Sequence, residues 1–220
     1  MAAYLPALIA ERRAAPQEDL LTNLAQAEVD GERFTEEEII AFVQLLLVAG
    51  NETTANLLNN SMLTLAEHPD QLALLRSSQE LLPSAIEEVL RYRTPIQFMF
   101  RGTRQDVKIG GQTIPKGKRV LAMIGSANRD PKQFPDPDRF QIAREPNPHI
   151  AFGHGIHFCL GAPLSRIEAR VALTEILGRM QSFELASSEP WEPRDALHVL
   201  GPNRLPIRFE AAHRTAGWGS

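Results

Sequence analysis

The stretch AFGHGIHFCLG, residues 151–161, contains the only cysteine in a chain of 220 residues. Gly153 and Gly155 precede Cys159, and residues without a Cβ allow the backbone to press against a flat ligand. The cysteine stands just before a predicted helix, whose N-terminal N–H groups would stabilise a thiolate. A thiolate shielded by amide donors suits a metal whose reduction potential must be tuned, and Cys thiolate is a known axial ligand of haem iron.

Other interpretations of a lone cysteine remain open on these residues alone. Most single cysteines are small buried apolar side chains. A cysteine protease is a second interpretation because His154 and His157 lie near Cys159, although catalytic Cys and His are normally distant in sequence. A zinc site would need more thiolates or a paired histidine spacing.

Composition narrows the class of protein. Apolar residues make up 43% of the chain, as in ordinary globular proteins, and the net charge is −4. That charge argues against nucleic-acid binding, which requires a clustered basic excess. A single cysteine favours a reducing compartment, residues 1–13 lack the basic start of a secretory signal, and the apolar run at 45–50 is too short to span a bilayer. We therefore expect a soluble, cytoplasmic protein that binds neither nucleic acid nor membrane.

The first part of the chain has helical patterns. An amphipathic helix is predicted over residues 4–13, followed by a turn and a new helix start. Thr35 and Glu38 form a capping-box pattern that opens a helix of roughly 30 residues, ending near Ala66. Two shorter helices are predicted at 69–77 and 80–92.

The character of the sequence changes after residue 94. Short apolar stretches between 98 and 130 predict antiparallel strands, with turns at Gly110-Gly111 and Lys116-Gly117. A proline-rich segment at 129–149 has no regular period. The remaining predictions are a helix from about Pro163 to Met180, a β-hairpin over 198–210 and a tail over 211–220.

The cysteine stretch resembles the haem-binding loop of cytochrome P-450, the haem-thiolate monooxygenases. The family pattern is Phe-x-x-Gly-x-x-x-Cys-x-Gly, and it is filled by Phe152, Gly155, Cys159 and Gly161. Gly153 and His157 match the bacterial soluble form of the loop. The resemblance implies that Cys159 is the iron ligand and that the other residues contact the haem.

A second resemblance lies in AGNETT, residues 49–54. Alone, this small-residue patch is typical of a helix crossing or a solvated face. In the family it is the oxygen-activation segment of the long central helix, which opens locally there. The resemblance implies that Ala49 and Gly50 leave room for dioxygen and that Glu52 and Thr53 are the acid–alcohol pair that delivers protons.

A third resemblance lies in EEVLR, where Glu88 and Arg91 stand three residues apart on a predicted helix. Alone, they would form an exposed ion pair worth about 0.2–0.5 kcal/mol. The family buries this pair and joins it to an arginine in the irregular segment. Arg139, in FPDPDRF, fits that place, and the implied role of all three residues is structural.

A fourth resemblance lies in FRGTRQ. Arg101 alone would be a solvated strand charge, but the family places a haem-propionate partner at this position. The resemblance implies that Arg101 and His157 bind a propionate. It also implies that the distal substrate pocket is lined by Ile96, Phe98, Val199 and Ala49.

The resemblance implies a mainly α fold with small antiparallel β-sheets, namely the C-terminal portion of the cytochrome P-450 fold. Residues 1–210 would include the long central helix and the Cys-ligand loop, and 211–220 would form the tail. The N-terminal half of the family fold is absent from the sequence.

The implied activity is insertion of one oxygen atom of O₂ into a small organic substrate by haem b. Electrons would come from NAD(P)H through a ferredoxin or flavodoxin and its reductase. Two alternatives remain: a peroxide-using relative, against which Glu52 and Thr53 argue, and a haem-binding but non-catalytic fragment.

Overall fold

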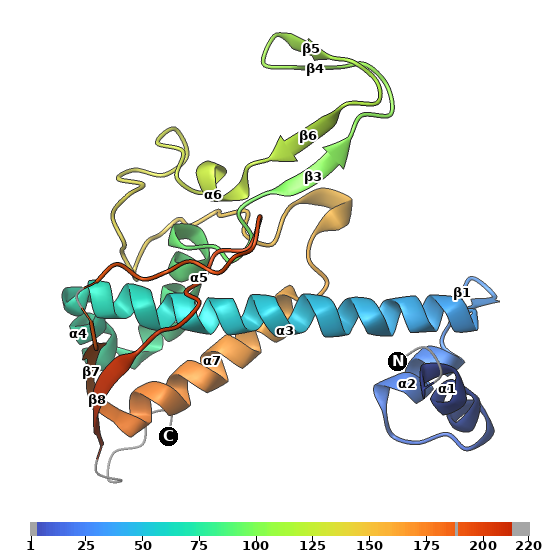
Figure 1. The fold of residues 1–220 in the computed structure, drawn as a ribbon, viewed down its shortest axis with the longest axis horizontal. Coiled ribbons are helices and arrows are strands. Elements are labelled where there is room, and N and C mark those ends of the chain that lie inside the picture. Colours follow the sequence, from blue (N-terminus) through green and yellow to red (C-terminus); the bar gives the residue numbers. More distant parts are fainter. Residues whose placement is uncertain (1–3, 188, 213–220) are drawn as a thin grey trace. The chain divides into compact units, whose positions relative to one another are not determined.

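The computed structural model describes residues 4–187 and 189–212 and shows a mainly helical chain with four small antiparallel sheets in that part (Figure 1). The chain divides into two compact units, Met1–Glu52 and Thr53–Ser220. This composition of helices and small sheets agrees with the expected fold class.

The first unit is a small helical body with one short hairpin. Its elements are α1 (Tyr4–Ala14), α2 (Leu20–Gln26), β1 (Glu28–Val29), β2 (Glu32–Arg33) and the first part of α3 (Glu36–Glu67). Asp19 caps α2 by accepting a 2.7 Å hydrogen bond from the N–H of Thr22. Ile9, Ala25 and Ile39 form its buried core.

Helix α3 begins at the predicted capping box. The Thr35 N–H donates to Glu38 Oε2 at 2.8 Å, and the Glu38 N–H donates to Thr35 Oγ1 at 3.2 Å. The helix runs without a break through residues 49–54, so the local opening expected there is not seen. Hydroxyls do bond the preceding turn further along, from Ser61 to the Leu57 carbonyl, but the helix continues there as well.

The second unit holds the remaining helices, and several of them share one apolar core. They are α4 (Pro69–Ser77), η1 (Gln79–Leu81), α5 (Leu82–Tyr92), α6 (Ile124–Ala127), η2 (Gly155–His157) and α7 (Ala162–Arg179). The core joins the end of α3 to α5 and α7 through residues such as Leu65, Ile86 and Leu173 (Figure 1). The predicted helices at 69–77, 80–92 and 163–180 are confirmed within a few residues.

Two of the sheets follow the predicted pattern. Strand β3 (Met99–Gly102) pairs with β6 (Arg119–Ala122), and β4 (Val107–Ile109) pairs with β5 (Gln112–Ile114). Gly110, Gly111 and Gly117 have φ angles of 57°, 82° and 79°, which favour glycine, and they make the turns that the sequence predicted. The proline-rich segment after α6 is irregular, also as predicted.

The predicted hairpin over 198–210 is wrong. Strand β8 (Ile207–Ala211) pairs instead with β7 (Met180–Leu185), and Val199 bridges to Ile96. Pro202 and Pro206 separate the two halves of the segment and cannot donate ladder hydrogen bonds, so each half pairs with a different partner. Strand β8 reaches into the predicted tail, and residues 213–220 lie outside the described residues.

A polar seam joins α3 to the segments around residues 95 and 200. Asn60 Nδ2 donates to the carbonyls of Arg93 and Leu200, both at 3.0 Å. Beside it, a Cβ added to Gly201 would lie 2.0 Å from Asn56 Oδ1 and 3.1 Å from Asn56 Cβ. Because both residues are buried, the seam has no room for another methyl group.

We therefore expect Gly201→Ala to lower the free energy of unfolding by about 1–3 kcal/mol, the cost of overpacking. Gly102→Ala is the matched control, because a Cβ there has nothing within 4 Å, and its effect should stay within about 0.5 kcal/mol. Urea unfolding followed by circular dichroism measures both. Equal unfolding midpoints for the two variants would show that the seam can expand.

Candidate functional site

Cys159 lies in the loop between η2 and α7 and is exposed. Its N–H donates to the carbonyl of Phe152 at 2.9 Å, and its own carbonyl accepts from the N–H of Ala162 at 3.2 Å. Gly161 is the N-cap of α7, and a Cβ added there would lie 3.8 Å from the cysteine sulfur. The thiol is thus held by backbone hydrogen bonds in the loop that leads into an 18-residue helix.

The backbone beside the thiol is open, and the loop carries several exposed apolar side chains. Gly153 and Gly155 have φ angles of 75° and 70°, and a Cβ added to Gly155 would meet no atom within 4 Å. Ile156 is 98% exposed, and the other large exposed apolar side chains of this region are Phe158, Leu160 and Leu164. One exposed thiol in a loop with glycines and exposed apolar side chains fits a haem with a single protein thiolate ligand.

The donor set does not fit a zinc site. Across the described residues, no group of three or more His, Cys, Asp or Glu side chains could hold a metal ion. His154 and His157 are exposed in the same loop as Cys159, without further ligands gathered around them.

Glu88, on α5, is the centre of a buried network. Its side chain and that of Arg91 are both 0% exposed, and Arg91 binds it with two hydrogen bonds of 2.8 and 2.9 Å. Arg144 Nε lies 3.2 Å from both carboxylate oxygens of Glu88. The Gln141 N–H and Asn147 Nδ2 also donate to the Glu88 carboxylate. The pair is therefore buried, and it holds the irregular segment.

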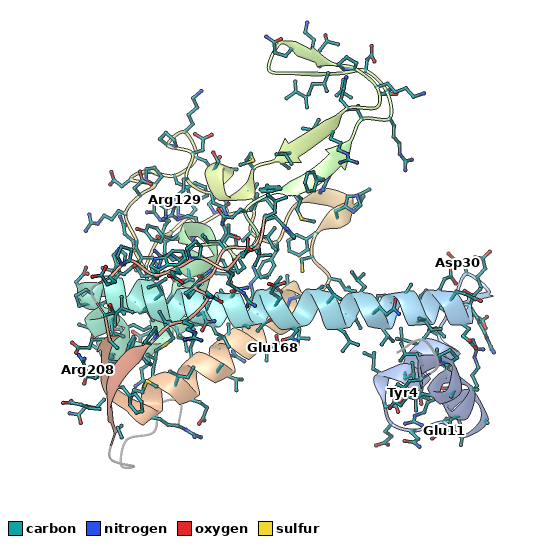
Figure 2. All side chains as sticks on the ribbon, in the orientation of Figure 1. Tyr4, Glu11, Asp30, Arg129, Glu168 and Arg208 are labelled. Carbon is teal, nitrogen blue, oxygen red and sulfur yellow. The ribbon has the colours of Figure 1, made fainter. Side chains whose placement is uncertain are left out.

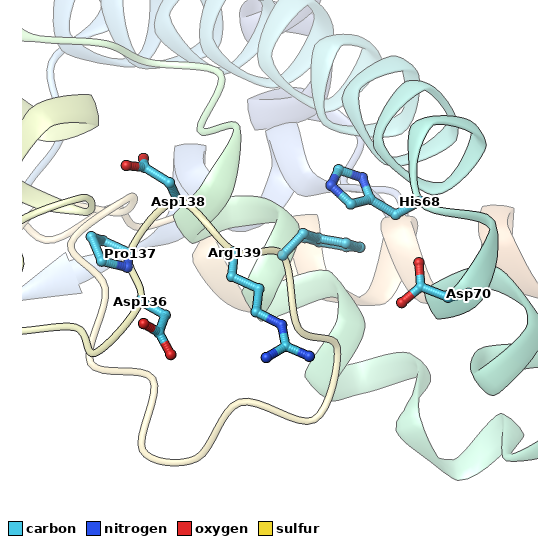
Figure 3. A pocket seen from close by; sticks show the side chains of 7 residues that line it. His68, Asp70, Asp136, Pro137, Asp138 and Arg139 are labelled. Atoms are coloured by element: carbon cyan, nitrogen blue, oxygen red, sulfur yellow. The ribbon is translucent and has the colours of Figure 1, made fainter.

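The third member of this network is Arg144, so the assignment of Arg139 is wrong. The Arg139 side chain is exposed and points into a surface pocket of about 710 Å³ (Figure 3). Only its carbonyl takes part, accepting from Arg91 and Arg144. Phe134 and Phe140, the first and last residues of FPDPDRF, are buried, and this leaves Arg139 on the outer side of the turn.

Glu87, next to Glu88 on α5, binds two residues that flank the Cys159 loop in the sequence. Arg166 of α7 grips it with two bonds of 2.6 and 2.8 Å, and His149 Nε2 lies 2.9 Å from it. Burial opposes the charge of Glu87, but the hydrogen bonds from Arg166 and His149 outweigh it and lower the pKa of Glu87 from 4.5 to about 2. The Arg166 guanidinium stacks over the Phe152 ring at 4.6 Å.

The residues of AGNETT fall on both sides of the boundary between the two units. Ala49, Gly50 and Glu52 belong to the first unit, and Thr53 begins the second. The neighbouring Thr54 donates a 3.1 Å hydrogen bond to Glu168 of α7, which Figure 2 labels. Glu168 was not singled out from the sequence.

The remaining candidates surround strand β3. Arg101 is exposed and donates to the carbonyl of Phe100 at 2.8 Å. Ile96 and Val199 are paired by a β-bridge, and the ring of Phe98 lies 5.5 Å from that of Phe100. Ile96 and Phe98 are partly buried, and Val199 is buried.

Comparisons with known proteins agree with this geometry. The cytochrome P450 family model matches residues 2–209. This chain belongs to the cytochrome P450 family. It is 50% identical over 211 residues to cytochrome P450 107B1 of Saccharopolyspora erythraea, covering 94% of this chain and 52% of that protein.

Two further P450 relatives show the same extent of likeness. The cytochrome P450 monooxygenase PikC of Streptomyces venezuelae is 45% identical over 224 residues, covering 98% of this chain and 53% of PikC. The crystal structure of CYP109E1 from Bacillus megaterium in complex with testosterone matches with a TM-score of 0.90 at 45% identity, covering 93% of this chain and 57% of that chain. The chain spans about half the length of the curated relatives it matches.

The P450 family implies a haem, and the residues around Cys159 fit it. The pocket of Figure 3 is a different place, because its lining residues lie near His68 and in 136–140 and none belongs to the Cys159 loop. No helix in the described ranges 4–187 and 189–212 is long and apolar enough to cross a membrane.

Sequence reasoning missed Glu87, His149, Arg144 and Arg166. The doublet of glutamates at 87 and 88 is visible in the sequence, but which arginine each one binds depends on the path of the irregular segment. A basic residue seven positions after the cysteine, on the predicted helix, is the one signal that pointed to Arg166.

Proposed function

We propose that this chain is the C-terminal part, over residues 1–210, of a haem-dependent monooxygenase that inserts one oxygen atom of O₂ into a small organic substrate. The other oxygen atom leaves as water, and the reaction consumes two electrons and two protons. The observation that carries the proposal is the single exposed thiol at the start of α7, in a glycine-rich loop with apolar side chains around it.

Binding of haem b falls to the Cys159 loop and its neighbours. Cys159 supplies the thiolate ligand, which donates electron density that favours O–O cleavage when the haem is bound. Phe152, Gly153, Gly155 and Gly161 shape the loop, and the Phe152 carbonyl fixes the Cys159 N–H. Arg101 and His157, both exposed, neutralise a propionate.

Proton delivery falls to the acid and the alcohol of α3. Glu52 supplies protons and the Thr53 hydroxyl orders the water that carries them, while Ala49 and Gly50 leave space for dioxygen. Both polar residues stand on a regular helix, which gives them a fixed spacing. A misplaced proton releases hydrogen peroxide instead of product.

The substrate is a small organic molecule that meets Ile96, Phe98, Val199 and Ala49. The bridge between Ile96 and Val199 holds two of these side chains on one small β-structure. These side chains are apolar, which suits an apolar substrate surface. The matched CYP109E1 structure is a complex with testosterone, which has such a surface.

Electrons come from NAD(P)H through a ferredoxin or flavodoxin and its reductase. Glu52 and Thr53 support this route over direct use of peroxide, because a proton-delivery pair serves the reduction of dioxygen. Turnover with peroxide and none with a reductase system would favour the peroxide-using alternative.

The absorbance spectrum of the reduced, CO-bound protein tests the proposal. The protein is loaded with haem, reduced and exposed to CO. We expect the thiolate-type band, which reports both the haem and its sulfur ligand. A band typical of a histidine or neutral-thiol ligand, or no haem uptake, would overturn the proposal.

Thr53→Ala should still allow NAD(P)H consumption but divert it into hydrogen peroxide. Since general acid–base positioning contributes a factor of about 100 or more, product formed per NAD(P)H should fall by about tenfold or more. Ser126→Ala is the matched control for loss of a hydroxyl, because Ser126 is an exposed serine on the short helix α6. An unchanged product ratio in Thr53→Ala would remove Thr53 from proton delivery.

A further inference from the structure

We propose that Glu87 is a positioning residue that sets the orientation of the Cys159 loop, acting through Arg166 and His149. The inference rests on the proposed function in one respect, namely that Cys159 ligates the haem iron. Glu87 itself does not contact Cys159.

The Glu87 carboxylate ties together both ends of the loop. His149 lies on the N-terminal side of the loop, and Arg166 lies one turn into α7 on the C-terminal side. Because α5 and α7 pack against each other, the carboxylate is fixed between the two flanks. A displacement of either flank would break a charge-assisted hydrogen bond.

Phe152 connects Arg166, and through it Glu87, to Cys159. The Arg166 guanidinium lies over the Phe152 ring, and the Phe152 carbonyl accepts the Cys159 N–H. His149 adds a second connection, since its Nδ1 accepts from the Ala151 N–H at 3.2 Å. With Nδ1 accepting, Nε2 carries the proton and donates to Glu87.

The position of Arg166 depends on Glu87, which accepts two hydrogen bonds from its guanidinium. The hydrogen bond with Glu87 is the largest cause that raises the pKa of Arg166, and it outweighs the lowering effect of burial. Two bonds to Glu87 therefore hold the planar guanidinium over the Phe152 ring. Loss of Glu87 would free Arg166, Phe152 and the loop together.

The two adjacent glutamates of α5 thus have separate tasks. Glu88 holds the irregular segment from Gln141 to Asn147, and Glu87 holds the chain from His149 to Arg166. Glu87 is part-exposed, with 29% of its side chain accessible, whereas Glu88 is fully buried. Removal of Glu87 should therefore leave the fold intact while it alters the loop.

The test compares Glu87→Gln with Glu175→Gln, a matched control that removes an exposed carboxylate paired with Arg179 on α7. Two readouts are taken on protein shown to be folded by circular dichroism. The first is the fraction of the thiolate-type band in the reduced, CO-bound spectrum. The second is the set of backbone amide chemical shifts in haem-free protein.

We expect Glu87→Gln to lose at least about half of the thiolate-type band and to shift the amides of residues 152–161, whereas Glu175→Gln changes neither. The effect is expected because a neutral amide has only one oxygen and cannot accept both hydrogen bonds from Arg166. An unchanged band or unchanged loop shifts in folded Glu87→Gln would overturn the proposal.

Two further outcomes are decided by the same readouts. If Glu87→Gln does not fold, Arg166→Lys replaces it, because lysine keeps the charge but not the planar fork, and the same loss is expected. If the unaltered protein shows no thiolate-type band, the proposed function fails. The positioning role of Glu87 is then tested by the amide chemical shifts of residues 152–161 alone.

Discussion

Cys159→Ser is expected to abolish the thiolate-type band of the reduced, CO-bound protein completely. Cys159 is the only cysteine, so the other sulfur donors are methionine thioethers, which cannot act as thiolates. The serine hydroxyl has nearly the same shape, and the loop hydrogen bond from residue 159 to Phe152 uses only the backbone. The loss should therefore come from the ligand atom and not from the fold.

Met123→Leu is the matched control, because it removes an exposed thioether sulfur and should leave the band unchanged. The measurement is the absorbance difference between reduced protein with and without CO, at equal haem content. A thiolate-type band that survives in Cys159→Ser would show that the ligand lies elsewhere.

The elements of this chain were predictable from local signals. The capping box at Thr35 and the glycine turns at 110–111 and 117 depend on residues close in sequence, and the structure confirms them. The hairpin over 198–210 failed because strand pairing is decided by distant partners, here β7 and Pro95–Gln97. Periodicity reports the exposure of a strand but not which strand lies beside it.

The candidate site divides in the same way. The loop pattern from Phe152 to Gly161 is local, and its residues could be named from the sequence. The partners of Glu88 come from a segment far from α5 in the sequence. The sequence therefore did not distinguish Arg144 from Arg139 as the arginine that binds Glu88. Such choices depend on how an irregular segment turns, and no helical or strand period describes that path.

Arg91→Ala is expected to cost about 3–5 kcal/mol of unfolding free energy, because it leaves the buried Glu88 charge with one partner fewer. The loss is larger than one ion pair. Arg91 also donates to the carbonyls of Asn128, Pro137 and Arg139, all in the irregular region. A domain has about 5–15 kcal/mol in total, so much of the folded population would disappear.

Arg179→Ala provides the matched control, since its pair with Glu175 is exposed and worth about 0.3–0.5 kcal/mol. Urea unfolding of both variants, followed by circular dichroism, gives the two free energies. Haem uptake should fall with folding in Arg91→Ala, because the released segment runs directly into the Cys159 loop. An Arg91→Ala protein with the unfolding midpoint of the control would mean that Arg144 alone can neutralise Glu88, and that the bond from Arg144 to Glu88 holds the irregular segment without Arg91.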